Sequence, residues 1–526
     1  TALLPRPPSH GGSRSRTADR GGTDGARPYY SRLAVLVTIL TVAEIVYVVV
    51  LATWILLEKR PPVSTLAWIL ALVALPYVGF VVFFLLGPRR LVRKRLKHRR
   101  ARGKAQQSGA VRQGREAQKT LSAQSSAVDP RVLQLERLAT AAGEPPSDLC
   151  ERVRILHDAA STYDAIEAAV AAAKHHVHVA YYIFDSGRAG TRLCDALVER
   201  AKAGVTVRVL VDDVGSSGMS RAMVKRMRAS GIKFARFNPV TFRRIRSRFD
   251  FRNHRKIVVC DGTVGFTGGI NVCDDYVAEA EATLRREKRR RTRRGQPAPW
   301  RDTHVMLEGD AVRWLQLTFL EDWHYATGYV PREPSYFPPP TGKGERRVQI
   351  VASGPDRELE PIQKLYFSAI TLAQSRVYVT TPYFVPDDSI LTALTTAALR
   401  GVDVRILVPR RSDSLIVTAA ARSYYDVVLG AGVRVYEYQP TMIHAKTLVV
   451  DDFFAAIGTA NMDNRSFRLN FEVTAVVYDK EQADELAAQF RKDLAQAREI
   501  KKHAREHLPL RWRFAEAGAR VLSPLL

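Results

Sequence analysis

Residues 253–271 read NHRKIVVCDGTVGFTGGIN, and residues 443–461 read IHAKTLVVDDFFAAIGTAN. Both stretches follow one pattern: a His, a Lys two residues later, an Asp five residues after the Lys, then six residues and G-x-x-N. A single His-x-Lys would carry no information. Two long copies in register indicate an internal duplication, which is the strongest signal in the chain.

The duplication extends upstream of both motifs. The runs HHVHVAYYIF (175–184), AGVTVRVLVDD (203–213) and SGIKFARFNP (230–239) correspond to RVYVTTPYFV (376–385), GVDVRILVP (401–409) and AGVRVYEYQP (431–440). Gly231 and Gly432 are 201 residues apart (432 − 231), whereas the motif histidines are 190 apart (444 − 254), so the first copy has 11 more residues before its His. These apolar runs alternate with helical segments such as 191–203 and 390–399, which predicts an α/β fold.

Within each motif, the apolar run after the Lys predicts a buried strand, in which side chains two residues apart share a face. His254 and Lys256 should therefore point the same way, and so should His444 and Lys446. The Asp of each motif lies at an odd spacing from its His, so we expect a structural role for it. These two residues are Asp261 and Asp451.

The end of each motif combines glycines with an amide. Gly268, Gly269 and Gly458 would permit close backbone approach, and Asn271 and Asn461 would offer amide donors beside it, although each Asn could also be a turn former. If the two halves face each other, two His, two Lys and two Asn surround one phosphate. The cations and amides would hold its oxygens while the histidines stand on opposite sides.

A catalytic imidazole needs a partner that fixes its tautomer. Asp302, in WRDTHVML, lies 48 residues after His254, and Glu472, in NRSFRLNFEV, lies 28 residues after His444. We therefore expect Asp302 to orient His254 and Glu472 to orient His444; ordinary surface charges on strands are the alternative. Tyr181, Tyr182, Tyr383 and Ser353-Gly354-Pro355 are further candidates for lining the site, or equally turn and core residues.

The N-terminal part of the chain predicts a membrane anchor. A basic tail (1–32) without apolar periodicity is expected to be disordered, and two apolar runs, 33–57 and 65–86, are each long enough to cross a bilayer. Glu44 interrupts the first run; we expect it to pair with the second helix or a second protomer, or to be protonated and bonded to backbone. The basic linker that follows, 88–135, places both termini of this hairpin in the cytoplasm by the positive-inside rule.

Composition limits the classes of function. The chain has 526 residues and a formal net charge of +27, which predicts at least two folding units and an anionic partner: nucleic acid, a membrane surface or a phosphorylated substrate. Its four scattered cysteines contain no CxxC pair, which disfavours a disulfide scaffold or a zinc site. The run RREKRRRTRR (285–294) is either a solvated loop or a contact for anionic lipid.

With YYIFD, TPYFVPDD and NMDNRSFRLNFEV, the paired motifs resemble the phospholipase D superfamily, and within it the bacterial cardiolipin synthases. The resemblance implies two pseudo-symmetric phospholipase D-like domains, 136–340 and 341–526, each with a mixed sheet flanked by helices. It also implies that the protein is held in the bacterial inner membrane, with its catalytic domains in the cytoplasm. It implies phosphatidyl transfer between two phosphatidylglycerol molecules through a phosphatidyl-histidine, without metal or cofactor. We expect His254 as nucleophile and His444 as acid/base. Expected partners are anionic phospholipids and the membrane, with a homodimer left open.

Three other functions remain. A phospholipase D or broader phosphatidyltransferase would use water or another alcohol as acceptor, and the motifs do not distinguish it because the acceptor pocket lies outside them. A nuclease of the same superfamily would suit the net charge, but two membrane spans disfavour it. A non-enzymatic scaffold is disfavoured because both motif copies are intact.

Overall fold

The computed structural model describes residues 27–57, 65–66, 69–70, 128–239, 251–277, 299–329, 331 and 333–523. These residues belong to two units, Thr1–Gly87 and Pro88–Leu526, and each is described by itself. The tail 1–26, most of the second predicted span, the linker up to residue 127 and the basic run 285–294 lie outside the described residues.

The first unit contains a single long helix among its described residues, α1 (Arg27–Leu57). Its segment Ala34–Leu57 is long and apolar enough to cross a membrane. The helix begins at Arg27, so the predicted disorder up to residue 32 is wrong for its last six residues. Ile69 packs against Leu51 and Ile55 of α1, but the second span itself stays a prediction, as does a partner for Glu44.

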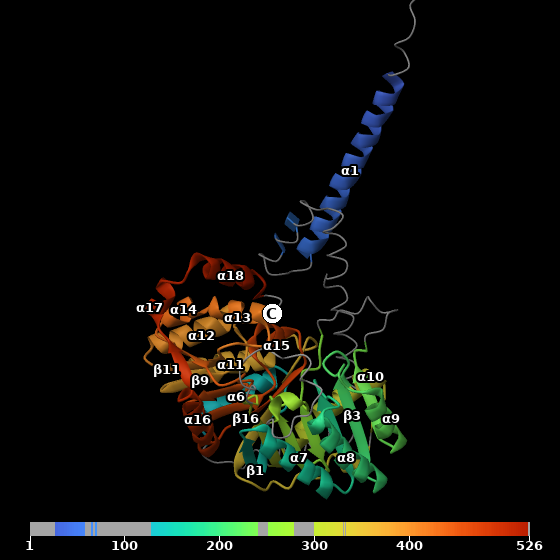
Figure 1. The fold of residues 1–526 in the computed structure, drawn as a ribbon, viewed down its shortest axis with the longest axis vertical. Coiled ribbons are helices and arrows are strands. Elements are labelled where there is room, and N and C mark those ends of the chain that lie inside the picture. The colour runs from blue at the N-terminus through green and yellow to red at the C-terminus, as the bar shows by residue number, and fades with distance from the viewer. Residues whose placement is uncertain are drawn as a thin grey trace, which may run out of the picture. The chain divides into compact units, whose positions relative to one another are not determined.

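The second unit is a mixed α/β fold built on one sheet of 15 strands (Figure 1). The strands are β1 (Asp148–Leu156), β2 (His176–Tyr181), β3 (Thr206–Asp212), β4 (Lys233–Phe237), β5 (Ile257–Cys260), β6 (Val264–Gly268), β7 (His304–Gly309), β8 (Arg346–Ser353), β9 (Arg376–Thr380), β11 (Asp403–Pro409), β12 (Arg434–Tyr438), β13 (Thr447–Val450), β14 (Phe454–Gly458), β16 (Glu472–Val477) and β17 (Ala497–Ile500). Two short strands, β10 (Phe384–Val385) and β15 (Met462–Asp463), form a separate parallel pair.

The strand order displays the duplication. Outward from the middle, one arm runs β8-β16-β14-β13-β9-β11-β12, and the other runs β1-β7-β6-β5-β2-β3-β4. The arms match strand for strand, and in each the outer three strands are parallel to one another while the inner ones are antiparallel. β1 pairs with β8, so the two halves share an unbroken hydrogen-bonded sheet. The two predicted pseudo-symmetric α/β halves are therefore present.

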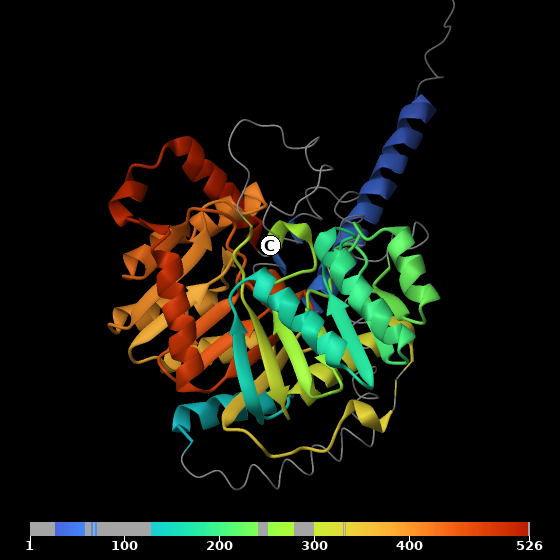
Figure 2. The same ribbon diagram turned by 60° about the horizontal axis from the view of Figure 1, so that its bottom comes forward.

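Helices cover the sheet in layers (Figures 1 and 2). They are α6 (Pro130–Ala141), α7 (Ala159–Ala172), α8 (Arg188–Lys202), α9 (Arg221–Ala229), α10 (Val312–Thr327), α11 (Pro361–Leu372), α12 (Asp388–Leu399), α13 (Leu415–Arg422), α14 (Tyr425–Gly430), α15 (Asn464–Arg468), α16 (Lys480–Leu494), α17 (Lys502–Glu506) and α18 (Leu510–Val521). α7, α8 and α9 build an outer core on the first half, and α6, α11, α12, α13 and α14 build one on the second. Between them, α10 and α16 join strands of both halves in a central core.

Helix α6 does not follow the domain boundary expected from the sequence. It spans the predicted end of the linker and the start of the first domain, yet Val132, Leu135 and Ala139 pack into the core of the second half. Arg131 explains this placement, because its guanidinium lies 3.0 Å from Asp451 and 4.0 Å from the centre of the Phe453 ring. The chain thus crosses to the second half before it forms the first.

Candidate active site

The two motifs enter the sheet in equivalent ways. His254 and Lys256 immediately precede the buried strand β5, and His444 and Lys446 precede β13, as the spacing predicted. Each entry is bonded to the opposite half. The amide of His254 donates to the carbonyl of Phe471 at 3.0 Å, and the amide of His444 donates to the carbonyl of Arg301 at 2.7 Å.

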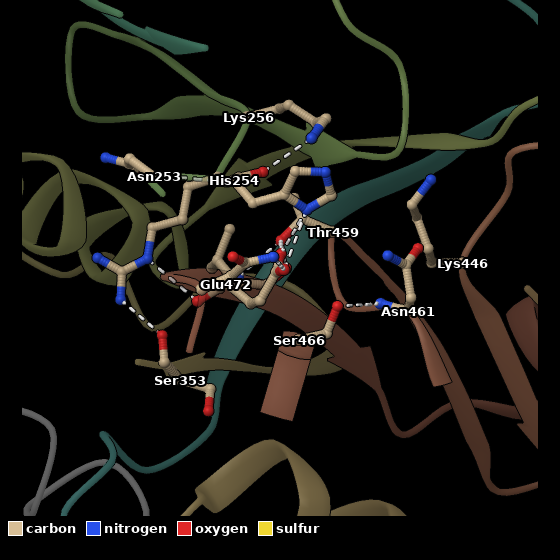
Figure 3. Close-up of polar contacts among 12 residues, drawn as sticks. Asn253, His254, Lys256, Ser353, Lys446, Thr459, Asn461, Ser466 and Glu472 are labelled. Carbon is tan, nitrogen blue, oxygen red and sulfur yellow. Dashed lines mark hydrogen bonds and ion pairs between the residues drawn. The ribbon is translucent and has the colours of Figure 1, made fainter. Parts of the chain in front are cut away.

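These crossed backbone bonds place a carboxylate of the opposite half beside each imidazole. Glu472 follows Phe471, and its Oε2 and Oε1 lie 2.9 and 3.0 Å from Nδ1 of His254 (Figure 3). Asp302 follows Arg301, and its Oδ2 lies 2.8 Å from Nδ1 of His444. The predicted pairing of each His with the carboxylate of its own half is therefore wrong. The cause is the exchange of backbone bonds, which brings residues 471 and 301 beside the motif of the other half.

Each pair leaves one ring nitrogen for chemistry. An Nδ1–H that donates to a carboxylate fixes the tautomer in which the Nε2 lone pair is free. Among the described residues, neither Nε2 has a hydrogen-bond partner. Both rings are almost fully buried, and burial, more than any other factor, lowers the pKa of His254 and that of His444, the latter to about 3. Both imidazoles are therefore neutral in the free site.

The two lysines place positive charge beside these rings. The ammonium of Lys256 donates to the carbonyl of His254 at 2.8 Å, and that of Lys446 lies 2.8 Å from Nδ1 of His444 and also donates to that residue's carbonyl. Burial, and then the neighbouring Lys446, lowers the pKa of Lys256 to about 7. Burial lowers the pKa of Lys446 to about 8, against the raising effect of Asp302 and Glu472. An anion entering the site would relieve both shifts.

The carboxylates remain ionised despite burial. Burial raises the pKa of Asp302, but Lys446 and His444 together outweigh it and lower the value to about 2. For Glu472, burial likewise raises the pKa, and His254 and Lys256 bring it below its usual range. Both carboxylates therefore carry negative charge beside the two lysines in the free site.

Both motif Asp residues accept hydrogen bonds from backbone amides. Asp261 accepts hydrogen bonds from the amides of residues 174, 175 and 176 at 2.8–2.9 Å. Asp451 accepts the matching bonds from residues 374, 375 and 376 at the same distances. Each Asp therefore anchors the chain that enters the neighbouring strand, β2 or β9, which is antiparallel to the motif strand.

The glycines and asparagines sit close to this machinery. A Cβ on Gly269 would lie 2.0 Å from Oδ1 of Asp302, and one on Gly458 would lie 2.6 Å from the carbonyl of Val473. Gly268 lies at φ +150°. Asn271 accepts from the amide of Ile183 at 3.3 Å. Asn461 is 4% exposed, and its Oδ1 has no partner in the described part of the chain.

Tyr276 belongs to the site and was missed by the sequence analysis. Its hydroxyl lies 2.9 Å from Nδ1 of His444 and 3.3 Å from Asp302. Tyr276 follows Asn271 by five residues, as Ser466 follows Asn461, and Ser466 Oγ accepts from the backbone amide of Asn461 at 3.1 Å. The alignment therefore places the two residues opposite each other, but because their types differ it does not mark either as part of the site.

Arg255, between His254 and Lys256, was also missed. It is fully buried and donates to the carbonyls of Glu472 at 3.0 Å and Ser353 at 3.2 Å, while Asp322 pairs with it at 2.7 Å. The guanidinium therefore holds the strand that carries Glu472 beside the first motif. Ala445 stands at the equivalent place in the second motif, so this clamp exists on one side.

The tyrosine candidates divide by environment. The ring of Tyr182 lies 5.0 Å from that of His254, and the ring of Tyr383 lies 6.4 Å from that of His444. Trp300, which the sequence analysis did not single out, lies 5.4 Å from His444. Tyr181 instead packs in the outer core against Phe184. The carbonyl of Ser353 accepts from the Arg255 guanidinium, and its hydroxyl donates to the carbonyl of Phe467.

The described residues contain no group of three or more His, Cys, Asp or Glu side chains placed to hold a metal ion. What they do contain is a pair of neutral imidazoles, each bound to a carboxylate, with two ammonium groups and aromatic rings around them. Such a set can attack a phosphorus atom from one side and exchange a proton on the other.

Comparison with known proteins agrees with this geometry. A family model described as "Cardiolipin synthase, PLD-like domain" matches residues 166–287 and 366–494, and one described as "Phospholipase_D-nuclease N-terminal" matches residues 45–88. A phosphatidylserine synthase from Haemophilus influenzae Rd KW20 shares the fold, with a TM-score of 0.54 at 14% identity over 75% of this chain and 100% of that one.

Curated relatives match over nearly the whole length. The cardiolipin synthase of Geobacillus kaustophilus is 41% identical over 91% of this chain and 92% of its own. That of Alkalihalophilus pseudofirmus is 40% identical over 93% and 94%. Together with the apolar helix α1, these relatives indicate that the protein is membrane-associated. Its paired motifs, its two-fold sheet and its full-length similarity show that the chain belongs to the cardiolipin synthase family.

Proposed function

We propose that the protein is a cardiolipin synthase that transfers a phosphatidyl group from one phosphatidylglycerol to a second one, with release of glycerol. The observation that supports this most is the crossed arrangement, in which each motif His is bound to a carboxylate of the other half. A phosphorus atom bound between the two free Nε2 atoms would have a nucleophile on one side and a general acid on the other. Full-length similarity to cardiolipin synthases supports the choice of lipid.

In the first step, Nε2 of His254 attacks the phosphorus and the bond to the glycerol oxygen breaks. The new phospho-imidazole is cationic, and Glu472 at Nδ1 stabilises its charge. Lys256, Lys446 and the amides of Asn271 and Asn461 hold the phosphate oxygens. Because the phosphate draws Lys446 away from Nδ1 of His444, the pKa of that imidazole rises. His444 then takes up a proton from water at Nε2 as the lipid binds, and donates it to the departing glycerol oxygen.

In the second step, the neutral His444 takes the proton from a hydroxyl of another phosphatidylglycerol. The resulting oxygen attacks the phosphorus, the P–N bond breaks, and His254 is regenerated with cardiolipin as product. Asp302 and Tyr276 hold the Nδ1 side of His444 during both proton transfers. One phosphodiester replaces another, so the exchange is close to balanced, and exclusion of water decides between synthesis and hydrolysis.

The membrane arrangement is part of the proposal. We place two spans, 33–57 and 65–86, with both termini and the catalytic halves in the cytoplasm, because the basic residues flank the outer ends of the pair. A homodimer is compatible with this arrangement, and Glu44 would then be a candidate contact between protomers. Anionic phospholipid is both the substrate and a component of the surrounding bilayer.

The test uses the full-length enzyme with phosphatidylglycerol vesicles as the only lipid, and identifies products by mass spectrometry. Cardiolipin and glycerol in equal amounts are expected; phosphatidic acid alone would make the protein a hydrolase. His254→Ala and His444→Ala should each abolish turnover. His175→Ala, an exposed histidine outside the site, is the matched control and should keep full activity. A labelled phosphatidylethanolamine added as a second lipid tests the donor and acceptor range.

A further inference from the structure

Helix α18 presents its apolar side away from the protein. Leu510, Phe514 and Val521 are 67%, 74% and 79% exposed. They follow one another at spacings of four and seven residues, which places them on one face of the helix. A helix packed on a globular body normally buries this face, so its exposure is unusual.

The opposite side of α18 is the one packed on the protein, and it is polar or small. Its buried residues are Glu516 and Ala519. Glu516 pairs with Arg505 at 2.6 Å, and the Arg520 guanidinium lies 4.8 Å from the centre of the Tyr424 ring. Because these contacts fix the helix by its polar side, the outward direction of the apolar stripe is built into the fold.

A second helix extends the same surface. α13, which packs along α18 (Figure 1), begins with Leu415, 82% exposed, and Ile416, 53% exposed. Trp512 is 52% exposed, but it is two residues from both Leu510 and Phe514 and therefore lies on another side of α18. We call Leu415, Ile416, Leu510, Phe514 and Val521 the apolar face.

The apolar face adjoins the active site at two points. Asp413, two residues before Leu415, accepts a hydrogen bond from the hydroxyl of Tyr383 at 2.8 Å, and the ring of Tyr383 faces His444. At the other end, the carbonyl of Ser523, just past α18, accepts from Asn464 at 3.5 Å, three residues after Asn461. Both ends of this face are therefore close to residues that contact the second motif or follow it in the chain.

The charges around the face favour one kind of occupant. Residues 501–523 contain six Lys and Arg and two acids, and both acids are near Arg505 in the sequence or paired with it. Arg511 and Arg513 are exposed on either side of Trp512. Apolar and aromatic side chains flanked by arginines are typical of a helix that lies in the interface of an anionic bilayer. A second copy of the same face would bring these arginines against one another.

We propose that the apolar face is an interfacial membrane-binding surface that inserts into anionic lipid and holds the second half of the active site at the bilayer. This contact is separate from the apolar segment Ala34–Leu57 of α1. Lipid substrate would then pass from the bilayer to the site without crossing water.

The experiment measures where the face lies in the full-length protein. Phe514→Cys is spin-labelled in vesicles of phosphatidylglycerol and phosphatidylcholine, and the collision rates of the label with oxygen and with a water-soluble nickel chelate are compared. The four native cysteines are buried, so the label reports the chosen site. Leu399→Cys is the matched control: Leu399 is also 74% exposed, but it ends α12 just before β11 begins beside the amino end of β9, whereas the second motif lies at the carboxyl end of β9.

At position 514 we expect oxygen collisions to exceed nickel collisions several-fold, and at position 399 we expect the reverse. Equal, water-like collision rates at both positions would overturn the proposal. Dipolar broadening between labels at position 514, without preference for oxygen, would show instead that a second copy covers the face. The measurement does not use catalytic turnover, so its outcome is independent of whether the proposed reaction is correct.

Discussion

The crossed pairing of histidines and carboxylates can be tested by asking which carboxylate supports nucleophilic attack. We consider Glu472→Gln, which keeps the size of the side chain but removes its charge from Nδ1 of His254, 2.9 Å away. Both groups are buried. Breaking a buried, hydrogen-bonded charge pair costs about 3–5 kcal/mol. If this loss falls on the cationic phospho-imidazole, the attack slows by about a hundredfold to several thousandfold.

A phosphatidyl ester of p-nitrophenol isolates this step, because a good leaving group needs no proton from the second His. The size and rate of the nitrophenol burst then report formation of the covalent intermediate. We expect His254→Ala to remove the burst and Glu472→Gln to slow it by the factor above. Asp302→Asn should leave the burst largely intact and slow the transfer to a second phosphatidylglycerol.

The refutation does not depend on which His attacks. If His444 is the nucleophile, Asp302→Asn should slow the burst instead, and the pairing across the halves still holds. The reasoning fails if the His and the carboxylate that control the burst come from the same half, that is, His254 with Asp302 or His444 with Glu472. Mass spectrometry of the trapped intermediate identifies the modified His independently.

Three further predictions concern the two motif lysines, Asp451 and Gly269. Burial lowers the pKa of Lys256 to about 7 and that of Lys446 to about 8, so both lose their ammonium form as the pH rises. We therefore expect kcat/KM to fall above about pH 7–8 in a steady-state pH profile. A flat profile to pH 9 would contradict this. Asp451→Ala should lower the free energy of unfolding by about 3 kcal/mol in thermal or denaturant melts, because its three backbone donors lose a charged acceptor, whereas exposed Asp452→Ala should change it by less than about 0.5 kcal/mol. Gly269→Ala should reduce turnover of phosphatidylglycerol by about a hundredfold or more, because the new Cβ displaces Asp302; wild-type activity would show that the carboxylate can move freely.

Much of the fold was predictable because each element expected in one copy of the repeat can be checked against its counterpart in the other copy. The spacing of apolar runs located β2, β3 and β4 and their counterparts β9, β11 and β12. The odd spacing of Asp261 and Asp451 predicted a role apart from the histidines, and both bond to backbone amides. These features depend on local period and on strand alternation, which a sequence displays directly.

The pairing of the carboxylates was not predictable in the same way. A repeat shows which residues are equivalent, but not which copy faces which. Here the backbone of Phe471 bonds to the first motif and that of Arg301 to the second, so equivalent side chains are exchanged across the two-fold relation. Tyr276 and Arg255 escaped for another reason: neither has a counterpart of the same type in the other half, and a search for symmetry overlooks such residues.

The exchange of carboxylates also constrains how the two copies can change over time. In most duplicated proteins, one copy can degenerate while the other preserves the activity. Here a harmful substitution at Glu472 damages the reactive group that its sister copy provides, and the same holds in reverse for Asp302. Neither copy can serve as a spare, and a separated half would need a partner to complete its His–carboxylate pair.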